Sequence, residues 1–200
     1  MNSDQYKTIK ERSEGFFKDK SSKFYGLAFQ VKSEEEIKEI RESVRKEYHD
    51  ARHHVYAYRL GSDMKIFRAS DDGEPSNSSG PPILGKIRSF ELTDILIIVV
   101  RYFGGTKLGI PGLINAYGTA AEEAIKHAKI IIKTVTKELT INFEYPQMND
   151  VMRIIKDNDL IILEQDFQLS CKIVLDIPEN SFEKILKTVQ NNHKLIVKND

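Results

Sequence analysis

The most constraining feature of this chain is an aliphatic run that leads into a glycine-rich loop and then into a helical pattern. Residues 95–100 are all aliphatic and have the length of one β-strand, which is typical of a central strand. A glycine-rich loop follows as far as Pro111, which suits the first position of a helix because proline lacks only an amide that would have no partner there. Residues 113–125 then place apolar side chains at helical spacing. This order predicts a strand, a tight turn and a packed helix within a mixed domain.

The residues before this run alternate between strand and helix patterns. A strand is expected at residues 24–31, and Ser33 opens a capping box that starts a helix ending near His49. A hairpin follows, with strands at residues 53–60 and 65–69. The segment at residues 70–82 is rich in Asp, Gly, Ser and Pro, which predicts a long ordered loop before a short helix over residues 83–90.

After residue 129 the pattern changes to that of a second, smaller domain. Residues 130–145 favour β-structure, with a first strand near residues 138–145. The later elements are expected as helix 147–158, strands 160–167 and 168–177, helix 180–191 and strand 195–198. This βαββαβ order is ferredoxin-like. The chain is therefore predicted to be α+β, with one domain over residues 1–135 and a ferredoxin-like domain over residues 136–200.

Composition excludes several classes of protein. Thirty basic and thirty acidic residues balance, so no global charge points to nucleic acid or to a membrane surface. The single cysteine, Cys171, rules out an internal disulfide and a multi-cysteine zinc site, and its strand position predicts a place in the core. The N-terminus is polar, and the longest aliphatic run is far shorter than a membrane span needs. We expect a soluble, cytoplasmic protein with no membrane partner and no cofactor.

The glycine-rich loop could hold an anion. Its glycines expose backbone amides beside a helix start, and basic side chains flank them, which together suit a phosphate group. The residues of this cradle are Arg101, Gly104, Gly105, Lys107, Gly109 and Gly112. The spacing is neither that of a Walker loop nor that of a dinucleotide fingerprint. The alternative is that the glycines only permit a tight turn and close packing.

The acidic motif at residues 71–75 contains three carboxylates, Asp71, Asp72 and Glu74. Carboxylates at this density could bind a hard cation such as Mg²⁺. They could instead cap turns or pair with Arg52, Arg68 or Arg101, and the turn-forming dipeptides favour this second interpretation. We therefore expect an ordered loop and no metal.

Two neighbouring histidines, His53 and His54, point to opposite faces of their predicted strand and so cannot converge on one ion. One could reach a surface site while the other is packed. The serines at positions 76, 78 and 79, with a histidine and Asp71, supply the ingredients of a catalytic triad, but no nucleophile elbow is present. Catalytic residues therefore stay unassigned.

Aromatic residues cluster near two strand ends, at Phe24, Tyr25 and Phe29 and at Tyr102 and Phe103. Such rings could stack on bases, although aromatic residues at strand ends usually serve packing.

Several of these blocks, in this order, resemble the IMPACT family in its bacterial, YigZ-like form. The matching blocks are residues 22–24, 51–54, 70–75, 99–105, 107–109, 112–113 and 116–118. The resemblance is strong over residues 15–125, and the remainder is similar to the smaller domain of prokaryotic members. It implies an N-terminal domain like the second domain of a small-subunit ribosomal protein and the fourth domain of elongation factor G. It also implies a ferredoxin-like C-terminal domain like the fifth domain of that factor.

Two hypotheses about function follow. The resemblance to translation-factor modules implies a non-catalytic regulator of translation that associates with RNA or the ribosome. Its candidate phosphate contacts are Arg52, His53, His54, Arg59, Arg68, Arg101 and Lys107. The alternative is an enzyme that acts on a phosphorylated or otherwise anionic small molecule by phosphotransfer or hydrolysis. The glycine-rich loop would hold the anion, Asp71, Asp72 or Glu74 would serve as base or metal ligand, and His53 or His54 would assist.

Overall fold

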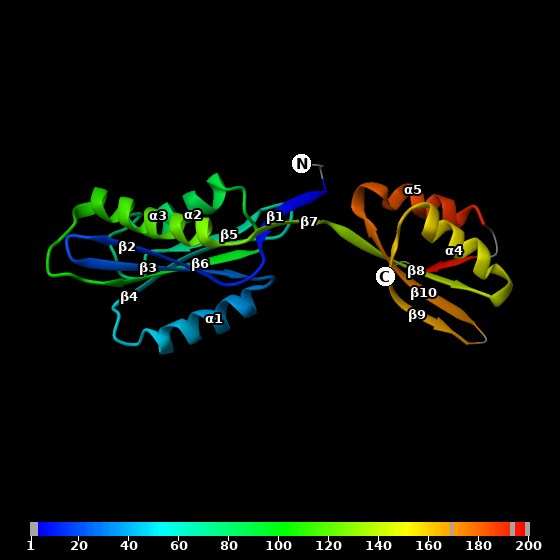
Figure 1. Cartoon of the computed structure of the whole chain (residues 1–200), viewed down its shortest axis with the longest axis horizontal. Coiled ribbons are helices and arrows are strands. Elements are labelled where there is room, and N and C mark those ends of the chain that lie inside the picture. Colours follow the sequence, from blue (N-terminus) through cyan, green and yellow to red (C-terminus); the bar gives the residue numbers. More distant parts are fainter. Residues whose placement is uncertain (1–3, 169, 193–194, 199–200) are drawn as a thin grey trace. The chain divides into compact units, whose positions relative to one another are not determined.

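The structure is a computed structural model that describes residues 4–168, 170–192 and 195–198. The chain divides into two compact units. The N-terminal unit is Tyr6–Lys133, and the C-terminal unit takes in the rest of the described chain (Figure 1). Asp4 groups with the C-terminal unit because its carbonyl oxygen accepts the backbone N–H of Val135 at 2.7 Å.

The N-terminal unit is built on a five-stranded antiparallel sheet. Its strands, in spatial order, are β2 (Ser13–Asp19), β3 (Ser22–Gln30), β6 (Ile95–Tyr102), β4 (His53–Leu60) and β5 (Ile66–Ser70). The aliphatic run is the central strand, as its continuous hydrophobicity predicts, and Ile95–Val100 are all buried. Both faces of the run are apolar because helices cover both faces of the sheet.

Helix α1 (Glu34–Glu47) packs on one face of this sheet, and α2 (Gly80–Ser89) and α3 (Gly109–His127) pack on the other (Figure 1). The predicted cap of α1 is confirmed, since the Ser33 hydroxyl oxygen accepts the N–H of Glu36 at 3.2 Å. The Glu36 carboxylate reaches back one residue further than a capping box requires, to the N–H of Lys32 at 2.8 Å. The predicted starts of the other two helices are wrong by a few residues. Both begin ahead of the expected positions because prolines fit in a first helical turn, where their missing amide leaves no bond unmade.

Two strands at the start of the chain were not expected from the sequence. Strand β1 (Gln5–Ile9) pairs with β7 (Ile130–Thr134) in a two-stranded sheet, and β2 forms the edge of the large sheet. Their polar and charged residues hide the strand pattern, because these strands gain their stability from partners distant in sequence. β7 lies within the segment that the sequence marks as β-prone.

The C-terminal unit has the predicted βαββαβ order. Its elements are β8 (Thr136–Phe143), a 3₁₀ turn (Tyr145–Gln147), α4 (Met148–Asp157), β9 (Ile161–Phe167), β10 (Cys171–Pro178), α5 (Glu179–Gln190) and β11 (Ile196–Lys198). The antiparallel sheet has the spatial order β11-β8-β10-β9, and α4 and α5 share a core with it. Cys171 is fully buried in that core, as predicted. No helix in the described part of the chain is long and apolar enough to cross a membrane.

Candidate functional site

Asp71 organises the loop that joins β5 to α2. Its Oδ1 accepts the N–H groups of Ser79 at 3.0 Å and Gly80 at 2.9 Å and the Ser79 hydroxyl at 2.7 Å, and its Oδ2 accepts the N–H of Asn77 at 2.8 Å. Burial acts to raise the pKa of Asp71, but these hydrogen bonds outweigh it and lower the pKa below its ordinary value. A charged Asp71 thus binds the loop to the first turn of α2.

Replacing Asp71 with asparagine should destabilise the N-terminal unit by about 1.5–3 kcal/mol at neutral pH, because an amide cannot accept all four bonds. The folded pKa lies below the ordinary value of 3.8, so the contribution of the carboxylate is complete above that value and is lost as pH falls through the folded pKa. The free energies of unfolding of both proteins should be measured with urea at pH values from neutral to strongly acidic. The difference between them should become smaller only at the acid end. A difference that stays constant with pH would contradict this role.

Asp72 joins the same loop to α1 and β4. Its Oδ1 accepts from Arg45 at 2.5 Å, and its Oδ2 accepts the backbone N–H of His54 at 2.7 Å. Its carbonyl oxygen lies 2.9 Å from Nδ1 of His53. Because a carbonyl can only accept, this contact places the proton of a neutral His53 on Nδ1 and leaves Nε2 as an acceptor.

Glu74 is buried in an ion pair under the loop. Its Oε1 accepts from the Arg101 guanidinium and from the Tyr117 hydroxyl, each at 2.6 Å, and the Glu74 and Arg101 side chains are only 5% and 8% exposed. Burial, and next the bond to Glu74, raise the pKa of Tyr117 far above its ordinary value, so its hydroxyl stays a donor. Arg101 thereby balances the charge of Glu74, and Oε1 of Glu74 already accepts two hydrogen bonds, which is typical of a structural carboxylate.

A hollow of about 430 Å³ opens beside this ion pair, and we name it the helix-side hollow. It is lined by Arg52, His53, Glu74, Pro75, Arg101, Phe103, Lys107, Leu108, Gly109, Ile110 and Leu113. Most of this lining is apolar, and the cationic groups come from three separate segments. Within the described residues, Arg52 and Lys107 form no ion pair with a carboxylate. The hollow therefore presents uncompensated positive charge beside the first turn of α3.

Gly104 has a packing role in the glycine-rich loop. A Cβ placed on it would lie 2.1 Å from the carbonyl carbon of Ser21, and its N–H donates to the Ser22 hydroxyl at 3.0 Å. Gly104 thus holds the loop against the β2–β3 turn. Gly109 has a φ of +73°, which favours glycine, at the first residue of α3. Among the described residues no side chain caps this helix start, so its first amides are open to an acceptor.

The helix-side hollow brings six of the predicted site residues together: Arg52, His53, Glu74, Arg101, Lys107 and Gly109. His54 is not among them. It points to the opposite face, is buried, and lies with Nε2 3.1 Å from the Tyr48 carbonyl oxygen, and burial lowers its pKa.

The remaining predicted residues lie outside this hollow. Arg59 donates to the carbonyl oxygens of Met64 and Leu92, at the other end of β4. Arg68 sits on the edge strand β5, opposite Tyr58. Gly105 provides the turn after β6 with a φ of +88°.

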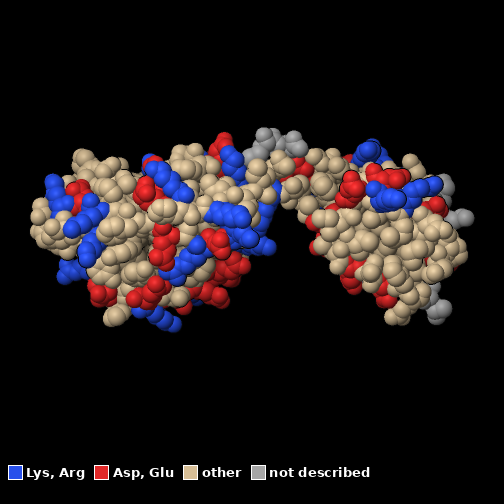
Figure 2. All heavy atoms as spheres, viewed as in Figure 1, with Lys and Arg blue, Asp and Glu red and all other residues tan. Residues whose placement is uncertain are grey.

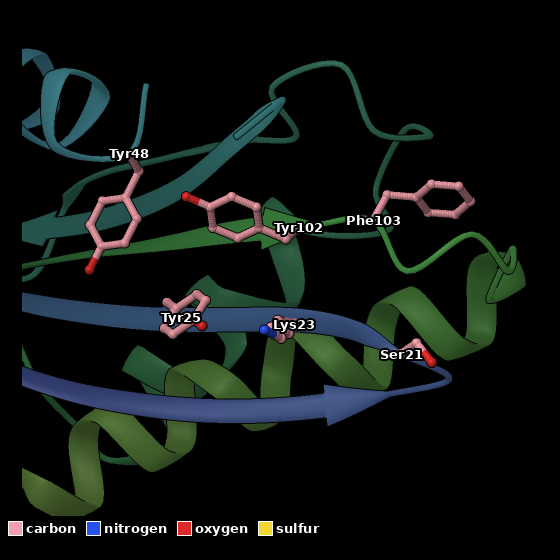
Figure 3. Close-up of a pocket in the computed structure, with 6 residues that line it drawn as sticks. All are labelled: Ser21, Lys23, Tyr25, Tyr48, Tyr102 and Phe103. Atoms are coloured by element: carbon pink, nitrogen blue, oxygen red, sulfur yellow. The ribbon is translucent and has the colours of Figure 1, made fainter. Parts of the chain in front are cut away.

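A second hollow of about 500 Å³ lies on the α1 side of the sheet, and we name it the aromatic hollow (Figure 3). It is lined by Ser21, Lys23, Tyr25, Tyr48, Tyr102 and Phe103. Phe103 follows the last residue of β6 and lines both hollows. The end of the central strand is thus flanked by one cationic and one aromatic surface.

Comparison with known proteins identifies the relatives of this chain. The Impact N-terminal domain model matches residues 20–125, which include the two loops and the central strand described above. The chain belongs to the IMPACT family. It is 34% identical to the IMPACT family member YigZ of Escherichia coli (strain K12), over 80% of this chain and 79% of the relative. It is 28% identical to the IMPACT family member YvyE of Bacillus subtilis (strain 168), over 93% of this chain and 87% of the relative.

A solved structure shares the whole two-domain fold of this IMPACT family member. It is a crystal structure of a hypothetical protein, 28% identical, which superposes with a TM-score of 0.72 and covers 97% of this chain and 96% of its own.

Sequence reasoning missed Arg45 and Tyr117 as partners of the family's acidic motif. Arg45 looks like a solvated helix residue, and Tyr117 lies on an apolar helix face, where core packing is the ordinary interpretation. Only the spatial proximity of α1 and α3 to the loop identifies them. The basic residues in the last turn of α1 gave no such signal, because the helix dipole alone is sufficient to favour them there.

Neither Ser78 nor Ser79 donates its hydroxyl to a histidine, as a catalytic triad would require. The Ser79 hydroxyl donates to Asp71, the Ser78 hydroxyl donates to the carbonyl oxygen of Pro75 at 2.6 Å, and both serines are fully buried. In the described part of the chain, no group of three or more His, Cys, Asp and Glu side chains is placed to hold a metal ion. The acidic motif instead has structural contacts for each of its three carboxylates.

Proposed function

We propose that this protein associates with RNA or with the ribosome in the cytoplasm and regulates translation without catalysing a reaction. One observation carries the proposal. Each carboxylate of the acidic motif already has hydrogen-bond donors, whereas Arg52 and Lys107 around the end of β6 are left without an acidic partner among the described residues. A local excess of positive charge on a chain of zero net charge is the footprint of a focused phosphate contact.

The lysines of the β2–β3 hairpin extend this positive surface. Lys18, Lys20 and Lys23 are exposed, and the described residues include no ion-pair partner for them. Gly104 holds the hairpin turn against the β6–α3 loop, so both basic segments lie at one end of the N-terminal unit. Basic side chains are visible at this end, the left of the view in Figure 2. Such an arrangement suits several phosphates of one backbone better than a single small anion.

Salt-dependent co-sedimentation with ribosomes, and anisotropy with labelled RNA, test the proposal. The double variant Arg52→Ala/Lys107→Ala should bind more weakly. The negative slope of log K against log salt should become shallower by about 1.4–1.8, since each lost phosphate contact removes about 0.7–0.9. Lys38→Ala, on the exposed side of α1, is the matched control and should leave the slope unchanged. The proposal would be rejected if no binding is detected or if the affinity does not depend on the salt concentration.

The helix-side hollow favours the second candidate function, an enzyme acting on a phosphorylated or anionic small molecule. Its volume of about 430 Å³ and its mainly apolar walls with a few polar groups are typical of small-molecule sites. A thermal-shift screen against nucleotides and phosphorylated metabolites discriminates between the two. The enzyme would be favoured by a ligand that raises the melting temperature of the wild-type protein but not that of Lys107→Ala, if the protein also binds no RNA.

A further inference from the structure

The aromatic hollow lies at the end of the sheet that α1 no longer covers. Helix α1 stops at Glu47, and Tyr48 follows as its cap. Beyond that point Tyr25 of β3 and Tyr102 of β6 lie on the face of the sheet that α1 covers elsewhere (Figure 3). Their rings are only partly buried, so a strand face that would normally pack against a helix is open to solvent.

The rings of this hollow hold one another in place. Tyr25 lies at the centre, with ring centroids 5.1 Å from Phe16, 6.1 Å from Tyr48 and 5.9 Å from Tyr102. The Tyr102 hydroxyl donates to Oδ1 of Asp50 at 2.6 Å, and this bond, more than burial, raises the pKa of Tyr102 to about 12. Tyr102 is therefore neutral and fixed at physiological pH. Preordered rings lose little conformational freedom when a flat ligand stacks on them.

Phe103 extends the aromatic surface outwards. Phe103 comes directly after the end of β6 and is 55% exposed. The Arg101 guanidinium carbon lies 5.5 Å from the centroid of the Phe103 ring, on the helix side. A phenylalanine this exposed buries little apolar area and leaves much of its ring available to another π-system.

The charges beside the rings point to a polyanion. Lys18 and Lys23 face each other directly across the β2–β3 hairpin, and Lys20 lies in its turn with a φ of +41°. Like charges directly opposite on an antiparallel pair are destabilising. A local arrangement that weakens the fold without visible compensation is typical of a functional surface.

We propose that the aromatic hollow binds single-stranded RNA by stacking its bases on Tyr25, Tyr102 and Phe103, while the hairpin lysines contact its phosphates. This inference rests on the proposed function and specifies the form of the nucleic acid. A duplex keeps the faces of its bases stacked inside, whereas an unpaired strand offers them to aromatic side chains. Stacking needs no base-specific hydrogen bond, so little sequence preference is expected.

Binding of a short uridine-rich RNA, measured by fluorescence anisotropy, tests the inference. Tyr102→Leu and Phe103→Ala should each weaken binding about tenfold, in line with the loss of one stacked base. Of the two hollows, Tyr102 lines the aromatic one and not the helix-side one, which separates the effects of the two sites. Phe67→Ala is the matched control, because Phe67 is 49% exposed on the edge strand β5 and should leave the affinity unchanged. Wild-type affinity in both hollow variants would overturn the proposal.

A spectroscopic variant gives a readout that a purely structural effect would not imitate. The chain has no tryptophan, so Phe103→Trp introduces a single indole at the hollow. Its emission should be quenched when single-stranded RNA binds, whereas Tyr145→Trp, in the C-terminal unit, should not respond. Emission from the Phe103→Trp variant that stays unquenched at saturating RNA would contradict stacking.

An abasic strand of the same length separates the two proposals. It keeps the phosphates and lacks the bases, so we expect it to bind about tenfold more weakly or worse. Equal binding of the abasic strand, the duplex and the single strand would reject stacking and leave the RNA association standing. Loss of all salt-sensitive binding to RNA and ribosomes would reject both.

Discussion

Replacing Glu74 with alanine is expected to destabilise the N-terminal unit by about 3–5 kcal/mol, the usual effect of removing one partner of a buried ion pair. The variant leaves the Arg101 guanidinium buried and without its acceptor, and it leaves the Tyr117 hydroxyl unpaired. Urea unfolding followed by tyrosine fluorescence measures the change, because seven of the eight tyrosines lie in Tyr6–Lys133.

Two further variants show whether charge is the cause. Glu122→Ala removes a partly exposed carboxylate that pairs with Lys86 and Lys126, and it should change stability by no more than about 1 kcal/mol. The triple variant Glu74→Met/Arg101→Met/Tyr117→Phe removes all three polar groups together and should recover most of the lost stability. If the triple variant is as unstable as Glu74→Ala, packing and not charge explains the effect.

Replacing Gly26 with alanine should destabilise the same unit by about 3 kcal/mol or more, the upper range for overpacking a core. An added Cβ would lie 2.3 Å from the carbonyl oxygen of Ala120, a backbone atom of α3 that cannot rotate away. Helix α3 would have to lift from the sheet, which would separate the fully buried Ala120 and Ala124 from β3. The same urea experiment applies, with the melting temperature as a second measurement.

Gly85 provides a control for which the expected change in stability has the opposite sign. It lies inside α2, and nothing stands within 4 Å of the position its Cβ would take. Gly85→Ala should therefore stabilise the unit by about 0.5–1 kcal/mol, because alanine loses less backbone freedom on entering a helix. A tolerated Gly26→Ala would show that α3 does not pack on β3 as closely as described.

Local patterns in the sequence were sufficient for most of the fold. The capping box at Ser33, the alternation in β4 and the aliphatic run of β6 are signals carried by neighbours in the chain, and each predicted element is present. The order of the predicted helices and strands alone then indicated the ferredoxin-like unit. The first two strands were missed because their stability comes from partners distant in sequence, which no local pattern records.

The site depended more on tertiary structure. The opposite orientation of His53 and His54 followed from strand geometry alone, and the ordering of the acidic loop followed from its turn-forming residues. The partners of the acidic loop could not be predicted from the sequence. Arg45 and Tyr117 belong to helices whose approach to the loop is set by the packing of the whole unit.

Tyr102 and Phe103, where β6 meets the glycine-rich loop, illustrate the difference between what the sequence determined and what the tertiary structure alone decided. Sequence by itself determined the family, the central strand and the presence of aromatic and basic residues at its end. It could not determine that these rings stay open to solvent, because that depends on where α1 stops covering the sheet. Alternation tells which face of a strand a side chain takes, whereas only the tertiary structure decides whether anything covers that face.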